Sequence, residues 1–361
     1  MVQLFDRDDS VEIGEIEIQR TAQSLGIGTR VLQDIIADAH HRNKRVVLSV
    51  GLGNHRALQL YERLGFHRIA QSETHHHMAC APPRVKVFPT DDSIVAAARA
   101  RAHAMRSRLR ALVASPDPPA GAAWREFGSA IGIRKPGKPG LARLMAASAD
   151  ALPQLDDAIA WMDGIEGADV TFEVPPIDAN QPLREALAHR GFFPRRFQAM
   201  LACEPRISDL RLPEGIAVRA PRADEMAAYM RTFMDGFRQP DQNWSDTERE
   251  YFEREMVQEF GDQICWRLLL ATVDGRHAGI GTLWFDGSTA FFSNGATIPA
   301  LRGRGVHGAL IRARLAEAAR AGADIAYVDT NVSSAAERNL HRHGFRLVCH
   351  LGMWSRLPKS A

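Results

Sequence analysis

Alternating apolar and acidic residues between positions 11 and 18 predict a half-buried strand at the start of the chain. Apolar residues at helical spacing follow at 31–39, and a β-branched run follows at 46–50. A second helix is expected at 54–64, where Gly65 is a typical helix stop, and a strand pair around 67–80 completes the unit. This order predicts an α/β unit built on a βαβ crossover.

The same order returns in the last third of the chain. Strands are expected at 216–219, 266–273, 278–285, 290–297 and 325–330, with helices at 224–237 and 334–343. A weaker copy lies in the middle, with a strand at 170–174 and a helix that starts at Asn180 and ends at Gly191-Phe192. We therefore predict an α/β fold in which a mixed, partly parallel twisted sheet with helices on both faces is repeated along the chain.

Two glycine turns with a constant spacing support the repeat. Gln23-Ser-Leu-Gly-Ile-Gly28 precedes Gly65-Phe66 in the first copy, and Arg302-Gly-Arg-Gly-Val-His307 precedes Gly344-Phe345 in the last. One offset of 279 superposes both landmarks, since Gln23 and Gly65 then fall on Arg302 and Gly344. The middle copy, at an offset of 126 from the first, has Ala149 where the glycine turn belongs.

A glycine turn that leads directly into a helix is suited to binding an anion, because backbone N–H groups and the helix dipole point at the same place. These turns resemble the Gln/Arg-x-x-Gly-x-Gly/Ala turn of the GNAT superfamily (GCN5-related N-acetyltransferases), which holds the pyrophosphate of coenzyme A. A Rossmann or Walker turn fits less well, because Val31 stands where a third glycine is needed and neither copy ends in Gly-Lys-Ser/Thr.

The resemblance implies acetyl-CoA as the acyl donor and no metal. In the first copy it assigns Gln23, Gly26, Gly28 and Thr29 to the pyrophosphate and Asn54 to the pantetheine arm. Tyr61 matches the tyrosine that protonates the departing thiolate, although an aromatic residue packed between helix and sheet is an equal alternative. Glu15 and Glu17 are the candidate general bases, and the alternative for both is a solvated strand face.

In the C-terminal copy the matching residues depart further from the family pattern. The residues assigned there to the cofactor are Arg302, Gly303, Arg304, Gly305, His307, Gly308 and Asn339. Leu340 replaces Tyr61 and Ser333 replaces Asn54. Asp329 is a candidate base in this copy, and a base is dispensable if the amine arrives neutral.

At 361 residues the chain is long enough for two or three domains. We expect a partial, cofactor-binding GNAT-like domain at 1–80, a helical segment with a degenerate copy at 81–205, and a complete acetyltransferase domain at 206–361. A net charge of +2 gives no reason to expect nucleic acid or a membrane as partner. The four separated cysteines and the lack of a signal-like start favour a cytoplasmic protein, and homo-oligomerisation stays open.

The expected reaction is the transfer of an acyl group, acetyl above all, from coenzyme A to a primary amine of a small molecule or peptide. Two alternatives stay open. One is a non-catalytic acyl-CoA-binding protein, which the truncated first copy and Leu340 favour. The other is an aminoacyl or peptidyl transferase on a tandem GNAT scaffold, against which the glycine turns argue. An acidic segment at 235–262 would suit a cationic acceptor, and a solvated acidic helix explains it equally well.

Overall fold

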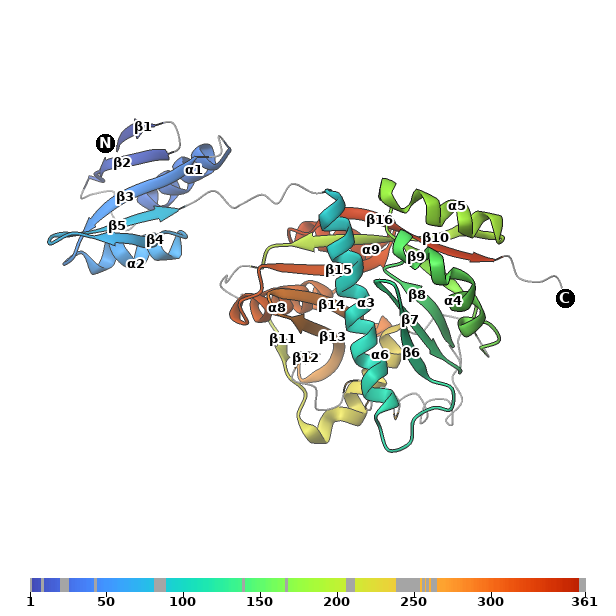
Figure 1. Cartoon of the computed structure of the whole chain (residues 1–361). Helices are drawn as coiled ribbons and strands as arrows, with labels where there is room; N and C mark the ends of the chain where they lie inside the picture. Colours follow the sequence, from blue (N-terminus) through green and yellow to red (C-terminus); the bar gives the residue numbers. More distant parts are fainter. Residues whose placement is uncertain are drawn as a thin grey trace. The chain divides into compact units, whose positions relative to one another are not determined.

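The computed structural model describes residues 2–7, 10–19, 26–41, 44–80, 89–137, 140–165, 168–205, 212–237, 254, 257, 260 and 265–356. The chain divides into two compact units, Met1–Val87 and Phe88–Ala361. The predicted boundary at 80/81 lies close to this division, whereas the one at 205/206 falls inside the second unit. Both units are mixed α/β structures, which confirms the predicted fold class (Figure 1).

The first unit contains a five-stranded sheet in the order β1-β2-β3-β5-β4. Only β2 and β3 are parallel, and the other neighbours are antiparallel. Its elements are β1 (Val2–Asp6), β2 (Ser10–Ile16), α1 (Ile27–His41), β3 (Arg45–Gly51), α2 (His55–Arg63), β4 (His67–Gln71) and β5 (His75–Cys80). The sequence analysis placed every one of these elements except β1.

Both helices of the first unit pack on one face of its sheet. Leu32 of α1 and Leu58 of α2 share a core with Val46 and Leu48, which alternate with outward residues along β3. Asn54 starts α2 because its side-chain oxygen accepts the N–H of Ala57 at 3.1 Å, an ordinary N-cap.

The second unit is built on an eleven-stranded sheet among the described residues. The middle copy comprises α3 (Asp91–Val113), β6 (Ala123–Phe127), β7 (Ala130–Lys135), β8 (Leu141–Met145), α4 (Leu155–Met162), β9 (Thr171–Val174), α5 (Gln181–His189) and β10 (Phe192–Cys203). The C-terminal copy comprises β11 (Ile216–Arg219), α6 (Met226–Phe237), β12 (Trp266–Val273), β13 (Arg276–Asp286), β14 (Thr289–Thr297), α8 (Val306–Arg320), β15 (Ile325–Asn331), α9 (Ala335–Arg342) and β16 (Arg346–Arg356).

The two copies in the second unit exchange their last strands. The sheet order is β11-β12-β13-β14-β15-β10-β16-β9-β8-β7-β6, so the middle copy's β10 lies next to β15 and the C-terminal copy's β16 lies next to β9. In the first unit a local hairpin, β4–β5, fills the corresponding places. The other two copies end in one long strand each, so each completes its sheet with the strand of the other. The predicted middle and C-terminal domains are therefore joined in one sheet.

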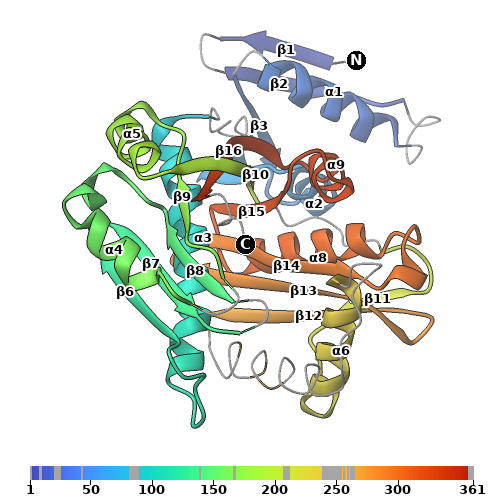
Figure 2. The same cartoon turned by 90° about the vertical axis from the view of Figure 1, so that its right-hand side faces the viewer.

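Helices cover both faces of this shared sheet. On β10, Met200 and Ala202 contact the core beneath α3 and α6, whereas Ala199 and Leu201 contact the core beneath α8 and α9. The long helix α3 packs against strands of both copies (Figure 1). Figure 2 shows α4 and α5 at the middle copy's end of the sheet and α6 at the other end.

A buried charge cluster also joins the copies. Arg101 of α3 forms an ion pair with Glu173 of β9, and its Nε donates to Asp329 of β15 at 3.2 Å. Glu173 is 1% exposed and also accepts from Arg143 of β8 at 3.3 Å. Burial is the largest influence on Arg101 and lowers its pKa, but Glu173 and Asp329 outweigh it and leave the pKa raised. Arg101 therefore stays charged between the two copies.

No described helix is long and apolar enough to cross a membrane. All four cysteines are among the described residues, and no disulfide links them.

We predict that a fragment of residues 206–361 does not fold alone, because without β10 the strand β15 would expose an unpaired edge and half of a hydrophobic core. A fragment of residues 88–361, which retains β10, is expected to unfold cooperatively with the stability that the same unit has in the full chain. All six tryptophans lie beyond residue 88, so tryptophan fluorescence during urea unfolding follows this unit alone. Cooperative unfolding of the 206–361 fragment would contradict the dependence on strand exchange.

Candidate coenzyme A site

A cavity of about 670 Å³ opens where β14 and β15 separate. Their parallel pairing ends at Phe292 and Val328, whereas β14 continues beside β13 as far as Thr297. The cavity lies between the end of β14, the glycine turn, the start of α8 and one side of α9. Its lining includes Gly236, Phe237, Gly295, Ala296, Thr297, Leu301, Arg302, Gly303, Gly305, Val306, His307, Gly308, Arg312, Ala335, Ala336, Asn339, Arg342 and His343, together with Pro213.

The glycine turn directs backbone N–H groups into this cavity. Gly303 and Gly305 have φ values of +80° and +86°, a region that residues with a side chain rarely occupy. Gly305 is the N-cap of α8, and no side chain caps this helix start. The first N–H groups of α8 are therefore available to an anion, with the helix dipole favouring it.

The charges around the cavity also fit a polyphosphate ligand. Arg302, Arg312 and Arg342 line it, and no Asp or Glu is among the described residues of the lining. The guanidinium of Arg302 donates to the carbonyls of Thr297 and Gly236, each at 3.2 Å, and this holds it at the turn. Thr297 Oγ1 and Arg312 Nε are buried and have no hydrogen-bond partner among the described residues. Such atoms favour a ligand that supplies the missing partners.

His307 lies at the start of α8 as a neutral ring. The side-chain amide of Asn339 donates to its Nδ1 at 2.8 Å, which places the proton of the neutral imidazole on Nε2. Burial, with smaller contributions from Arg314 and His343, lowers the pKa of His307 to about 4. His307 can therefore donate a hydrogen bond to a phosphate but adds no positive charge near neutral pH.

Of two further residues predicted in this copy, Gly308 and Arg304, one lines the cavity and the other does not. Gly308 lines the cavity, and a Cβ there would come within 3.2 Å of the His343 ring, so the close approach of α8 and α9 favours glycine. Arg304 is not among the lining residues, and its guanidinium pairs with Asp274 at 3.1 Å instead.

A second cavity, of about 460 Å³, occupies the same position in the first unit. Its lining residues are Ile16, Ile18, Gly26, Ile27, Gly28, Thr29, Asn54, Arg56, Ala57, Leu60 and Arg63. When 279 is added to each number, all but Asn54 fall on a residue that lines the larger cavity; Asn54 falls on Ser333. The offset found in the sequence thus relates two cavities as well as two motifs.

Four of the predicted residues of the first copy line its cavity. Gly26, Gly28, Thr29 and Asn54 line its cavity, and Gly26 has a φ of +77°. Gln23 lies outside the described residues.

Three further predicted residues do not line this cavity. Tyr61 packs in the core beside Phe66, where burial raises the pKa of its phenol. Glu15 and Glu17 are exposed and alternate along the chain, at the end of β2 and just after it, with Ile16 and Ile18, which do line the cavity. Leu340, the counterpart of Tyr61, is also a core residue.

In the middle copy the corresponding place is closed. The N–H of Ala147 donates to the carbonyl of Glu173 at 2.9 Å, across the gap where the strands separate in the other copies. The side chain of Asn180, the counterpart of Asn54, accepts the N–H of Ala149 at 3.1 Å. The N–H group at the position of the glycine turn is therefore already satisfied within the protein.

The sequence analysis missed several lining residues. Thr297, Arg312 and His343 lie outside the motif, so no pattern identified them. Arg342 could have been found, because it is the counterpart of Arg63 at the offset of 279.

Comparison with known families agrees with this geometry. Residues 1–75 match the FR47-like protein family, and residues 225–345 match the acetyltransferase (GNAT) family. The chain belongs to the GNAT superfamily, in a tandem arrangement with one degenerate copy. Membership supports acyl transfer as the general chemistry of the C-terminal copy.

Solved structures are similar in fold at low sequence identity. A GCN5-related N-acetyltransferase from Kribbella flavida is 15% identical with a TM-score of 0.51, covering 72% of this chain and 96% of that one. One from Sphaerobacter thermophilus is 18% identical with a TM-score of 0.44, covering 74% and 93%. A tandem GNAT protein from the clavulanic acid biosynthesis pathway is 13% identical with a TM-score of 0.48, covering 76% and 98%. No curated protein matches the chain in sequence.

The lowered pKa of His307 predicts a pH-dependent loss of stability. Between about pH 6.5 and pH 4 the unfolded chain binds a proton at this residue and the folded protein does not, so stability falls as the pH falls. The loss should approach about 3 kcal/mol at the acid end. We expect urea unfolding, followed by tryptophan fluorescence, to show a smaller loss of stability in His307→Gln than in the unchanged protein between pH 7 and pH 4.5. Parallel pH profiles of the two proteins would rule this effect out.

Proposed function

We propose that this protein is an N-acyltransferase that transfers an acetyl group from acetyl-CoA to the primary amine of a small molecule or peptide. The observation that supports this most directly is the larger cavity. It combines a separated strand pair, a glycine turn at a helix start, three arginines and buried polar atoms without partners. Together these features suit the parts of an acyl-CoA: the strand pair suits the arm, and the turn, the arginines and the polar atoms suit the phosphates.

In the proposed reaction the amine nitrogen attacks the thioester carbonyl, a C–N bond forms, and the C–S bond breaks. The protein would hold the phosphates through α8 and the arginines, and the arm would lie between β14 and β15. Backbone N–H groups of the separated part of β14 would stabilise the oxyanion. The thiolate then takes up a proton from water, because Leu340 offers none.

The identity of the base follows from the charge cluster. Asp329, a candidate from the sequence, has one carboxylate oxygen engaged with Arg101 at 3.2 Å. Because this carboxylate is engaged with Arg101, we propose that the amine reacts in its neutral form with water as the proton acceptor.

We place the working site in the C-terminal copy. That copy has the preceding strands β11–β13 and helix α6, whereas among the described residues of the first unit the turn is preceded by β1 and β2 alone. Gly295 and Thr297 line its cavity, whereas the residues at the corresponding positions of the first unit are the bulkier, apolar Ile16 and Ile18.

A second candidate function is a non-catalytic acyl-CoA-binding protein. It is favoured by the placement of Tyr61 and Leu340 in hydrophobic cores, so that no tyrosine is among the described residues that line either cavity. Turnover of any amine with acetyl-CoA excludes this candidate. An aminoacyl or peptidyl transferase would show no calorimetric binding of acetyl-CoA.

We predict that Gly305→Glu weakens the binding of acetyl-CoA by at least about 100-fold, because a carboxylate at the helix start repels the pyrophosphate and removes charge-assisted hydrogen bonds. Isothermal titration calorimetry measures this directly. Gly305→Ala is the matched control, since it imposes the same strain at positive φ without the charge.

Gly26→Glu makes the corresponding change in the first unit and is expected to leave binding at the C-terminal site unchanged. If both glutamate variants bound acetyl-CoA like the unchanged protein, the coenzyme A assignment would fail. If only Gly26→Glu lost binding, the working site would lie in the first unit.

A further inference from the structure

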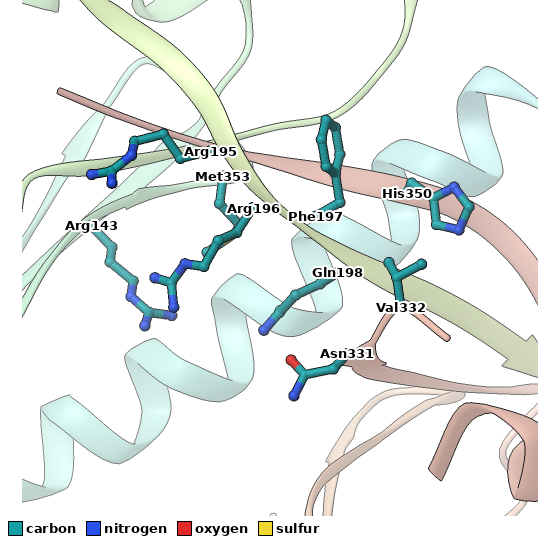
Figure 3. Close-up of a pocket in the computed structure, with 9 residues that line it drawn as sticks. All are labelled: Arg143, Arg195, Arg196, Phe197, Gln198, Asn331, Val332, His350 and Met353. Atoms are coloured by element: carbon teal, nitrogen blue, oxygen red, sulfur yellow. The ribbon is translucent and has the colours of Figure 1, made fainter. Parts of the chain in front are cut away.

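A third cavity, of about 620 Å³, lies at the place where the two copies exchange strands. Arg196 and Gln198 come from β10, Arg143 from β8 and His350 from β16, while Asn331 ends β15 (Figure 3). Both copies therefore contribute to its lining. Its volume is in the range of ordinary small-molecule sites.

The lining of this cavity is cationic. It contains three arginines, Arg143, Arg195 and Arg196, and within the part of the chain that the structure describes it contains no Asp or Glu. The guanidinium of Arg195 donates to the carbonyl of Arg356 at 3.2 Å. Arg143 reaches Glu173 at 3.3 Å, but that carboxylate is already paired with Arg101.

Arg196 carries the positive charge that the described carboxylates around this cavity leave unbalanced. Within the described part of the chain no carboxylate forms an ion pair with it, and Figure 3 shows its side chain directed toward the same space as that of Arg143. Burial lowers the pKa of Arg143, and repulsion by Arg101 and Arg196 adds to this, although Glu173 acts in the opposite direction. Two neighbouring guanidinium groups with one carboxylate already shared favour an anion between them.

A buried hydrogen-bond acceptor lies next to these cations. Gln198 Oε1 is buried and accepts no hydrogen bond from the described residues. Gln198 is the register partner of Asn331, and the two amide side chains lie together in Figure 3. An unsatisfied buried acceptor is costly, and an N–H group of a ligand would satisfy it.

The cavity also adjoins the proposed coenzyme site along the chain. Asn331 and Val332 line this cavity, and Ala335 and Ala336, a few residues later, line the coenzyme cavity. The segment that follows β15 therefore contributes to the lining of both cavities.

We infer that this cavity binds the acceptor substrate and that the acceptor is an amine that also carries an anionic group, a carboxylate or a phosphate. Arg143 and Arg196 bind the anionic group, and Gln198 and Asn331 receive the N–H side of the molecule. This inference rests on the proposed acyl transfer. It differs from the cationic acceptor that the acidic segment at 235–262 suggests, most of which lies outside the described residues.

The test compares amines that differ only in charge. With acetyl-CoA, the release of coenzyme A is measured for phosphoethanolamine against ethanolamine and for γ-aminobutyrate against butylamine. We expect the anionic member of at least one pair to have the higher kcat/KM by at least about tenfold. Arg196→Gln should reduce this preference by about 10- to 100-fold, mainly through KM, as the loss of a charge-assisted hydrogen bond implies.

Two controls separate this inference from the proposed function. Arg346→Gln removes an exposed arginine of β16 that does not line the cavity, and it should keep the preference. Calorimetric binding of acetyl-CoA should be the same in both variants. Failure of acetyl-CoA binding in the unchanged protein would overturn the proposed function.

A direct binding measurement tests the cavity without turnover. Millimolar phosphoethanolamine or γ-aminobutyrate should raise the melting temperature of the unchanged protein and not that of Arg196→Gln. Normal acetyl-CoA binding together with equal kcat/KM for charged and neutral amines, an unchanged preference in Arg196→Gln, or no thermal shift in the unchanged protein would overturn the inference and leave the coenzyme site standing.

Discussion

The pairing of β10 with β16 is the interaction on which the second unit depends. Each of its two copies ends in one long strand where the first unit has a hairpin, so each copy alone would lack a neighbour for its central strand. The exchange satisfies the backbone hydrogen bonds of both edges at once and brings the two hydrophobic cores beneath one continuous sheet. A degenerate middle copy is then indispensable even though it has no phosphate-binding turn, because it supplies β10 to the copy that has one.

The same exchange explains where the charges lie. Arg101, Glu173 and Asp329 come from three elements of two copies, and they can meet only because β9 and β15 belong to one sheet and α3 crosses it. A buried ion pair of this kind adds little net stability, since desolvation offsets the attraction, but removing one partner would leave an uncompensated buried charge. The cluster is better understood as a constraint on how the copies fit together. Through Glu173 the cluster also engages Arg143, one of the arginines that line the third cavity.

Periodicity and the constant offset predicted most of what lies within one copy. The bounds of β2, β3 and β12 and the glycine turns at Gly26 and Gly305 follow from local residue types, and the offset of 279 relates the two candidate coenzyme cavities almost residue by residue. What lies between copies could not be predicted in this way. The start of β10, Phe-Phe-Pro-Arg-Arg, shows no alternation, and its two neighbours are far away in sequence. Residues such as Arg143 and Arg196 therefore carried no signal. For Tyr61 the sequence allowed a catalytic or a packing role, and its place in the core is a matter of tertiary contacts alone.

The asymmetry between the copies now has a physical basis. Most of the lining of each candidate coenzyme cavity comes from a strand end, a glycine turn and two helix starts within one βαβ unit. This explains how the first unit retains such a cavity with so few residues before the turn. An acceptor pocket has no such local source. In the second unit it is formed by strands from two copies, so it can exist only where the exchange occurs. The middle copy supplies β10 and the three arginines, and the C-terminal copy supplies the phosphate-binding turn. In the proposed reaction, the acyl donor and the acceptor would then meet near the end of β15.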